Sequence, residues 1–130
     1  MSIKVHWYDD DQTIIQYEFV GEWVWEEFEA RYEDTLVMMY SVRHKVDFIL
    51  DFRHNESFPD GFLDRLIEAA EYNHPNMGIA LYVGVPEVMK AVGEMLEMLY
   101  PHLVDTYPFE YAATVAEAEA TLTRHRSEWA

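Results

Sequence analysis

Residues 46–66 read VDFILDFRHNESFPDGFLDRL, and this stretch decides the fold. An apolar run from Val46 to Phe52 is followed by a polar loop, and a helix is predicted to begin at Asp60-Gly61. A buried strand that feeds a helix is the unit from which α/β sheets are built. Because α/β proteins usually place their sites in loops at the carboxyl ends of strands, we expect functional residues in this loop.

The rest of the chain repeats the alternation of strand and helix on both sides of this unit. The predicted strands are Ile3–Tyr8, Thr13–Val20, Val46–Phe52, Met77–Val83 and Tyr107–Tyr111. The predicted helices are Val24–Val42, Asp60–Tyr72, Pro86–Tyr100 and Val115–Arg126. This order implies parallel pairing with right-handed crossovers, preceded by an antiparallel hairpin. We therefore predict a single α/β domain over residues 1–130, with a mixed sheet of four or five strands and about four helices.

The charge balance restricts the classes of partner. The 130 residues include 25 acidic and 9 basic side chains, for a formal net charge of −16. Such a chain repels a phosphate backbone, which binds through Lys and Arg. We therefore expect neither nucleic acid nor an anionic membrane surface as a partner.

Residue usage also restricts the chemistry and the location. The chain has no cysteine, which excludes disulfides, thiolate catalysis and cysteine-ligated zinc. The six histidines lack the spacing of a zinc site, and the Asp9–Asp11 run lacks that of a calcium loop. We predict no metal and no cofactor. Without a signal-peptide pattern or an apolar run of about 20 residues, the expected location is the cytoplasm.

Three stretches, which together span nearly the whole chain, carry a family resemblance. The hairpin runs into Gly21–Phe28 (GEWVWEEF), the strand Phe48–Asp51 is followed by a glycine-led helix, and Tyr111–Ala118 (YAATVAEA) closes the chain with a strand and a helix. In these stretches the chain resembles the STAS domain of anti-sigma-factor antagonists, and more closely its SpoIIAA-like relatives. The resemblance implies a SpoIIAA-like fold and a regulatory protein-interaction function without catalysis.

One departure from the family pattern concerns its phosphorylation switch. Regulatory STAS antagonists carry D-S-S/T-G at the start of the helix after this strand, and a kinase modifies the first serine. The matching stretch here is Phe58–Gly61, in which Pro59 stands at the position of the phosphorylated serine. Gly61 is kept, and Asp60 is a good N-cap, so the helix start survives without the switch residue.

Ser57 is the remaining candidate for phosphorylation in this loop. A phosphate there would need basic partners, and only Arg53 and His54 are near in sequence. The sequence therefore argues against phosphorylation of Ser57, and the usual switch is predicted to be absent.

The same loop contains Asp51, His54 and Ser57, the residue types of a Ser-His-Asp triad. No nucleophile elbow surrounds Ser57, so we predict no catalytic residues. Because these residues lie at the carboxyl end of a strand, we interpret them as contacts to a partner or ligand. The candidate binding residues are Asp51, Arg53, His54, Ser57, Asp60 and Gly61.

The helix predicted over Pro86–Tyr100 offers a second candidate surface. It is rich in methionine, and Met98 falls outside its main apolar stripe. Core packing, a homodimer face and a groove for a small apolar ligand remain open for this helix.

Two functions follow from these observations. The first is a non-enzymatic STAS-like module that binds another protein or a second copy of itself. The alternative is a carrier of a small apolar ligand or lipid, because SpoIIAA-like domains resemble CRAL-TRIO lipid-binding domains in fold. In that case, aromatic and methionine side chains on the last two helices would line the pocket.

Overall fold

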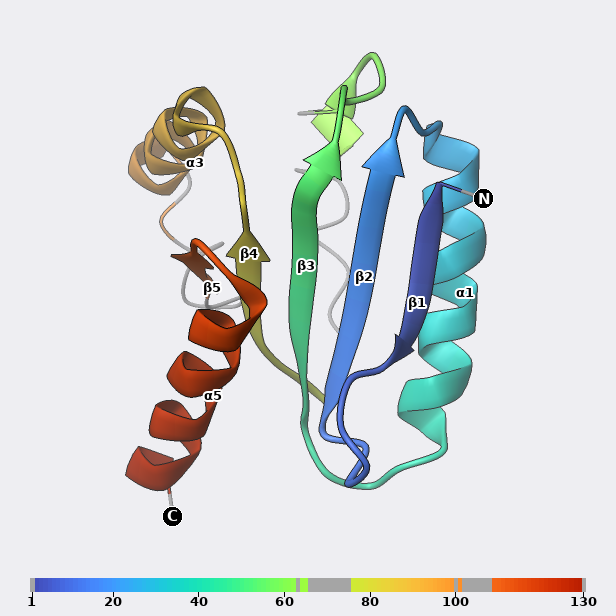
Figure 1. Cartoon of the computed structure of the whole chain (residues 1–130), viewed down its shortest axis with the longest axis vertical. Helices are drawn as coiled ribbons and strands as arrows, with labels where there is room; N and C mark the ends of the chain where they lie inside the picture. The colour runs from blue at the N-terminus through green and yellow to red at the C-terminus, as the bar shows by residue number, and fades with distance from the viewer. Residues whose placement is uncertain (1, 63, 66–75, 100, 102–108, 130) are drawn as a thin grey trace.

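A five-stranded mixed sheet, in the order β1-β2-β3-β4-β5, forms the centre of the protein (Figure 1). The computed structural model describes residues 2–62, 64–65, 76–99, 101 and 109–129. The strands are β1 (Ile3–Trp7), β2 (Ile14–Gly21), β3 (Val46–Asn55), β4 (Met77–Val83) and β5 (Phe109–Ala112). The helices with described bounds are α1 (Trp25–Tyr40), α3 (Glu87–Leu99) and α5 (Val115–Trp129).

The pairing confirms the predicted α/β class and the mixed sheet. Strand β1 is antiparallel to β2, and the pairs β2–β3, β3–β4 and β4–β5 are all parallel. Consecutive parallel strands lie side by side, the usual arrangement for strands that follow one another along a chain. The carboxyl ends of four strands therefore meet at one edge of the sheet.

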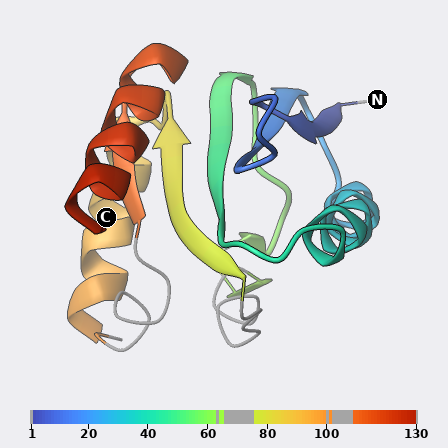
Figure 2. The same cartoon turned by 90° about the horizontal axis from the view of Figure 1, so that it is seen from below.

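Apolar side chains cover both faces of this sheet. On one face, Tyr17, Phe19 and Phe48 pack with α1 in the larger core cluster. On the other face, Ile49 and Leu81 pack against Leu122 of α5. Figure 2 shows α1 and α5 on opposite sides of the sheet. Successive residues of β2 and β3 alternate between these two faces because side chains along a strand have a two-residue period.

The end of β3 differs from the prediction. The strand continues to Asn55 instead of ending at Phe52, because β2 is long enough to pair with it as far as Gly21–Asn55. The register shifts on the way, so that Phe52 and Arg53 together oppose Phe19. This is a β-bulge, a feature that redirects side chains near the end of a strand. The loop begins after Asn55.

The predicted helices agree with the structure in place but not at every end. The first begins at Trp25 and stops at Tyr40, whose side chain is exposed. The helix predicted over Asp60–Tyr72 has helical residues at Phe62, 64 and 65, and its part from residue 66 lies outside the described residues. The last helix continues to Trp129, beyond its predicted end.

Gly78→Ala is expected to loosen the attachment of α5 to the sheet. An alanine β-carbon would lie 2.0 Å from Oδ1 of Asp47, which accepts the Ile79 N–H at 2.8 Å. The same carboxylate also accepts a hydrogen bond, at 2.8 Å, from Nη2 of Arg126 on α5. Displacing it should cost about 1–2 kcal/mol of unfolding free energy, measured by urea denaturation. As a control, Gly93→Ala meets only the hydroxyl of one tyrosine within 3 Å and should cost less.

Candidate functional site

The first part of the candidate site is an ion pair between Asp51 and Arg53 near the carboxyl end of β3. Arg53 donates from Nε to Asp51 Oδ1 and from Nη2 to Oδ2, each at 2.9 Å. Its backbone N–H also donates to Oδ1 at 3.1 Å. Because Arg53 lies in the bulge, this last bond satisfies a backbone donor at a point where the sheet register shifts. The aspartate thus holds both the backbone and the side chain of Arg53.

Burial and charge act in opposite directions on this pair. Asp51 is only 2% exposed, and burial by itself would raise its pKa. The hydrogen bonds and the charge of Arg53, helped by His54, outweigh burial and hold the pKa of Asp51 below its ordinary value. The hydrogen bond to Asp51 likewise raises the pKa of Arg53. Both groups are therefore charged at neutral pH.

The ion pair leaves part of the guanidinium available. Asp51 occupies the edge formed by Nε and Nη2, and no hydrogen bond to Nη1 is formed within the described part of the chain. The Arg53 side chain is 40% exposed. A guanidinium can bind two planar acceptors along different edges, so the free edge can receive an acceptor from outside.

Gly84, directly after β4, provides the space in which Arg53 lies. It has a φ of +72°, and an alanine β-carbon there would lie 2.6 Å from Arg53 Cγ and 3.0 Å from Arg53 Cα. Arg53 is thus positioned from two sides. The Asp51 carboxylate of β3 holds it by hydrogen bonds, and Gly84 after β4 leaves room for it because glycine has no side chain.

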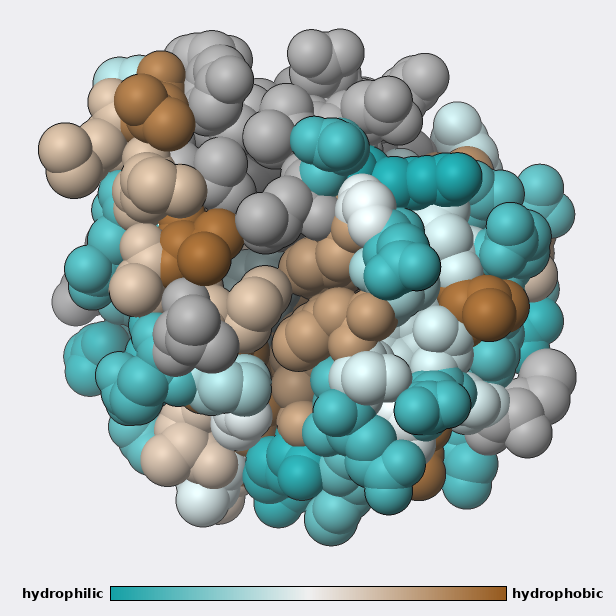
Figure 3. Space-filling model, turned by 90° about the horizontal axis from the view of Figure 1, so that it is seen from above, coloured by the Kyte–Doolittle hydropathy of each residue, from teal (hydrophilic) through white to brown (hydrophobic). Residues whose placement is uncertain are grey.

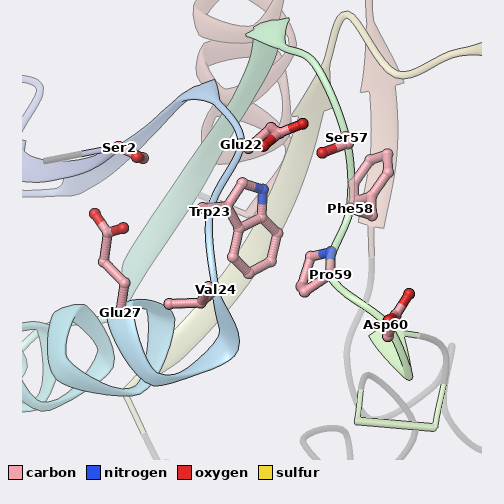
Figure 4. A pocket seen from close by; sticks show the side chains of 9 residues that line it. All are labelled: Ser2, Glu22, Trp23, Val24, Glu27, Ser57, Phe58, Pro59 and Asp60. Atoms are coloured by element: carbon pink, nitrogen blue, oxygen red, sulfur yellow. The ribbon is translucent and has the colours of Figure 1, made fainter.

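The second part of the site is a pocket of about 640 Å³ on the β2 side of the same edge. It is formed where the segment from β2 to α1 faces the segment after β3 (Figure 4). Its lining residues are Ser2, Glu22, Trp23, Val24, Glu27, Ser57, Phe58, Pro59 and Asp60. Figure 4 shows the Trp23 ring between the two segments, with the Glu22 carboxylate directed toward Ser57.

A hydrogen bond fixes the orientation of Trp23 in this pocket. Its Nε1 donates to Asn55 Oδ1 at 2.7 Å, at the residue where β3 ends. Trp23 is 5% exposed, and its ring makes tilted contacts with the rings of Phe19 and Phe28. Trp23 therefore borders the pocket as a fixed, almost fully buried side chain.

The six predicted site residues lie in or beside these two parts. Asp51 and Arg53 are in direct contact, and His54 is near enough to lower the pKa of Asp51. The other three belong to the segment after β3: Ser57 and Asp60 line the pocket, and Gly61 has a φ of +74°. His54 lies within β3, whereas the prediction placed it in the loop.

The residue types of a catalytic triad are not assembled. Arg53 holds both oxygens of Asp51. Among the described residues, no hydrogen bond joins His54 to Asp51 or to Ser57. In the same part of the chain, no group of three or more His, Asp or Glu side chains is arranged to hold a metal ion.

The prediction missed the pocket residues that come from the β2–α1 segment. Glu22, Trp23 and Glu27 entered the prediction only as part of the stretch Gly21–Phe28 that carries the family resemblance. Their position after Gly21 was an available signal, because β2 also ends at the carboxyl edge of the parallel strands. Which residues of that segment face the loop after β3 depends on the register between the two strands.

The methionine-rich helix presents a separate apolar surface. Met95, Met98 and Leu99 of α3 are 50%, 82% and 63% exposed. Figure 3 shows brown and tan side chains over this helix. The exposure of Met98 agrees with its predicted place outside the main stripe. None of these residues lines the pocket.

Comparisons with known proteins give no assignment: no family model matches the chain, and no match is found among curated proteins. The STAS resemblance therefore stays a prediction. A search of the described helices finds none with the length and apolarity needed to cross a membrane.

Proposed function

We propose that this protein is a non-enzymatic binding module of SpoIIAA-like fold that acts in the cytoplasm by contacting another protein. The contact surface is the carboxyl end of β3 and the segment after it, and comprises Arg53, His54, Ser57, Asp60 and Gly61, with the buried Asp51 holding Arg53 in place. The observation that carries the proposal is the Asp51–Arg53 pair, which presents one edge of a fixed guanidinium to the outside. Fixing a side chain before binding lowers the entropy lost in the complex.

Two further observations support this function. The sheet begins with an antiparallel hairpin and continues with parallel strands, which is compatible with the family that the sequence resembles. A phosphate on Ser57 would add negative charge to a pocket whose charged lining residues, Glu22, Glu27 and Asp60, are all acidic. Binding is therefore proposed to proceed without the phosphorylation switch of regulatory STAS proteins.

The test is to recover the wild-type protein and its variants from the lysate of the host organism. Native mass spectrometry then gives the mass and the amount of the complex that each one forms. Asp60→Lys should reduce the recovered complex by about tenfold, because it reverses a charge at the contact. Glu33→Lys makes the same change of charge on the exposed side of α1 and should leave recovery unchanged. Arg53→Ala should also reduce recovery, but it removes the partner of Asp51, so Asp60→Lys is the deciding variant.

Two results would overturn the proposal. If Asp60→Lys and Arg53→Ala, both folded by circular dichroism, leave recovery unchanged, the contact lies elsewhere. If the protein is recovered with only a few hundred daltons of added mass, the carrier function replaces the binding module. The described pocket lies away from α3 and α5, the helices on which the carrier prediction depends.

A further inference from the structure

We infer that the face of β1 and β2 opposite α1 receives an acidic segment of the bound protein, with Arg53 as its anchor. The inference deepens the proposed function, and it rests on that function for the claim that the segment belongs to a protein. Three features of this face support it. No described helix covers it, its exposed titratable side chains are all basic, and it continues into the contact surface at the end of β3.

Only part of the sheet face opposite α1 is covered by a described helix. On this side α5 packs mainly against β3, β4 and β5. Tyr8, just after β1, reaches α5 through a hydrogen bond from its hydroxyl to Glu119. Beyond that contact, Figure 1 shows β1 and β2 without a described helix in front of them. Lys4, His6 and Val20 are accordingly exposed.

The period of the strands and their register assign the side chains of this face. The odd-numbered residues of β1 and β2 pack in the core with α1, so the even-numbered ones face the other way. His6 Nε2 lies 3.1 Å from Gln16 Oε1, which confirms that these two side chains share a face. Lys4 lies opposite Glu18, and Glu18 lies opposite Asp51 of β3. The face therefore extends from β1 to the Asp51–Arg53 pair.

The charges of this face differ from those of the chain as a whole. The chain has 25 acidic and 9 basic side chains. The exposed titratable side chains on this face are all basic, and they are Lys4, His6, Arg53 and His54. Its two carboxylates are less accessible, because Glu18 is half-buried and Asp51 is buried and bound by Arg53. Such a face is complementary to carboxylates of a partner.

Two cations on this face have donors available for such carboxylates. Asp51 occupies the Nε and Nη2 edge of Arg53 and leaves Nη1 without a hydrogen bond in the described part of the chain. Lys4 forms no ion pair with any described residue, although it lies opposite Glu18. Hydrogen bonds between a cation and a carboxylate are stronger than neutral ones. Because Arg53 is already held in place, an incoming carboxylate would bind it with little loss of side-chain entropy.

The overall charge of the protein does not oppose this contact at short range. The net charge of −16 repels an acidic segment at a distance. At physiological salt, however, that repulsion is screened beyond about 8 Å, whereas contacts at hydrogen-bond distance are screened much less. The local basic side chains therefore decide the binding once the segment lies on the face.

The experiment is an NMR titration of the ¹⁵N-labelled protein, at physiological salt, with the peptide acetyl-Ala-Glu-Ala-Glu-Ala-Glu-amide. The control peptide has Gln in place of each Glu, which keeps nearly the same shape and removes the charge. We expect the Glu peptide to shift the Nε–H signal of Arg53 and the amides of Lys4 and His6. It should bind about tenfold more tightly than the Gln peptide.

Lys4→Glu should weaken binding of the Glu peptide by about tenfold, since it reverses a charge on the face. Lys4→Gln removes the charge without placing a second carboxylate opposite Glu18, and should weaken binding by about threefold. Arg43→Glu makes the same change of net charge as Lys4→Glu in the loop before β3, where Arg43 is exposed, and should leave the affinity unchanged.

Two results would overturn the inference. Equal binding of the Glu and Gln peptides would show that the face does not select carboxylates. Equal losses in Lys4→Glu and Arg43→Glu would show that the net charge of the protein, and not this face, controls the binding.

This titration is independent of the protein complex. If the Glu peptide does not bind, but Asp60→Lys, outside this face, still reduces the recovered complex, the acidic segment is wrong and the binding module stands. If the Glu peptide binds, Lys4→Glu prevents it, and no protein complex is ever recovered, the face is supported and the proposed function is not.

Discussion

Gly84→Ala is expected to destabilise the protein by about 2–5 kcal/mol. Two effects add at this position. The φ of +72° is in the left-handed region, which costs a residue with a β-carbon about 1–2 kcal/mol. The new β-carbon would also lie 3.0 Å from Arg53 Cα, and a backbone atom inside a sheet cannot move aside as a side chain can. Urea denaturation of the two proteins measures the difference.

Gly61→Ala is the matched control for this prediction. Gly61 has a nearly identical φ of +74°, but nothing lies within 4 Å of the position that a β-carbon would occupy. It should therefore show the backbone cost alone, about 1–2 kcal/mol. Equal losses at the two glycines would mean that the contact between Gly84 and Arg53 is not tight. A larger loss at Gly84 would confirm that β4 helps to hold the site arginine.

Arg53→Met is expected to cost about 2–3 kcal/mol at pH 7. The substitution keeps much of the packing surface but leaves the Asp51 carboxylate buried without its cation. The expected loss is at the lower end for broken ion pairs, because the Arg53 side chain is 40% exposed and partly screened by water. Thermal or urea denaturation at several pH values measures it.

The pH dependence of this loss has a definite sign. The folded-state pKa of Asp51 is below its ordinary value, so the ion pair stabilises the wild type above the unfolded pKa of about 3.9. That contribution disappears as the pH falls through the folded-state pKa. In the variant, burial without a cation raises the pKa of Asp51, so its penalty is relieved when the carboxyl takes up a proton. The difference between the proteins should therefore shrink from pH 7 toward pH 3.

Arg124→Met on α5 is the control for Arg53→Met. Arg124 is exposed, and its substitution should change the unfolding free energy by less than about 0.5 kcal/mol at every pH. A loss in Arg53→Met that is equally large at pH 3 and pH 7 would contradict the role given to Asp51. Replacing Asp51 by Leu in the same chain should recover part of the loss, because no buried charge then remains.

Local sequence patterns predicted strands well where the residues were apolar throughout or alternated regularly between apolar and polar. Met77–Val83 is apolar throughout, and β4 has those same bounds. In β2, Ile15, Tyr17 and Phe19 alternate with Gln16 and Glu18 in the sequence, and all three belong to the larger core. Both signals depend only on the two-residue period of a strand, which contiguous residues carry by themselves.

The candidate site could be predicted only in part, because its two halves depend on pairing between distant segments. Asp51 and Arg53 are two residues apart, so the loop was recognisable as a site. Their ion pair, however, needs the bulge opposite Phe19 and the space at Gly84, which follow from the register of β3 with its two neighbours. The same register sets the length of β3.

For the pocket, too, the sequence gives some features directly, whereas others depend on the pairing of distant segments. The type of each lining residue, and hence the negative charge of the pocket, can be read from the chain directly. That Trp23 meets Asn55, 32 residues away, and faces Ser57 and Asp60 across a cavity is a consequence of parallel pairing between β2 and β3. Periodicity describes neighbours along one segment, whereas a pocket consists of the space between segments, and only their packing in three dimensions sets that space.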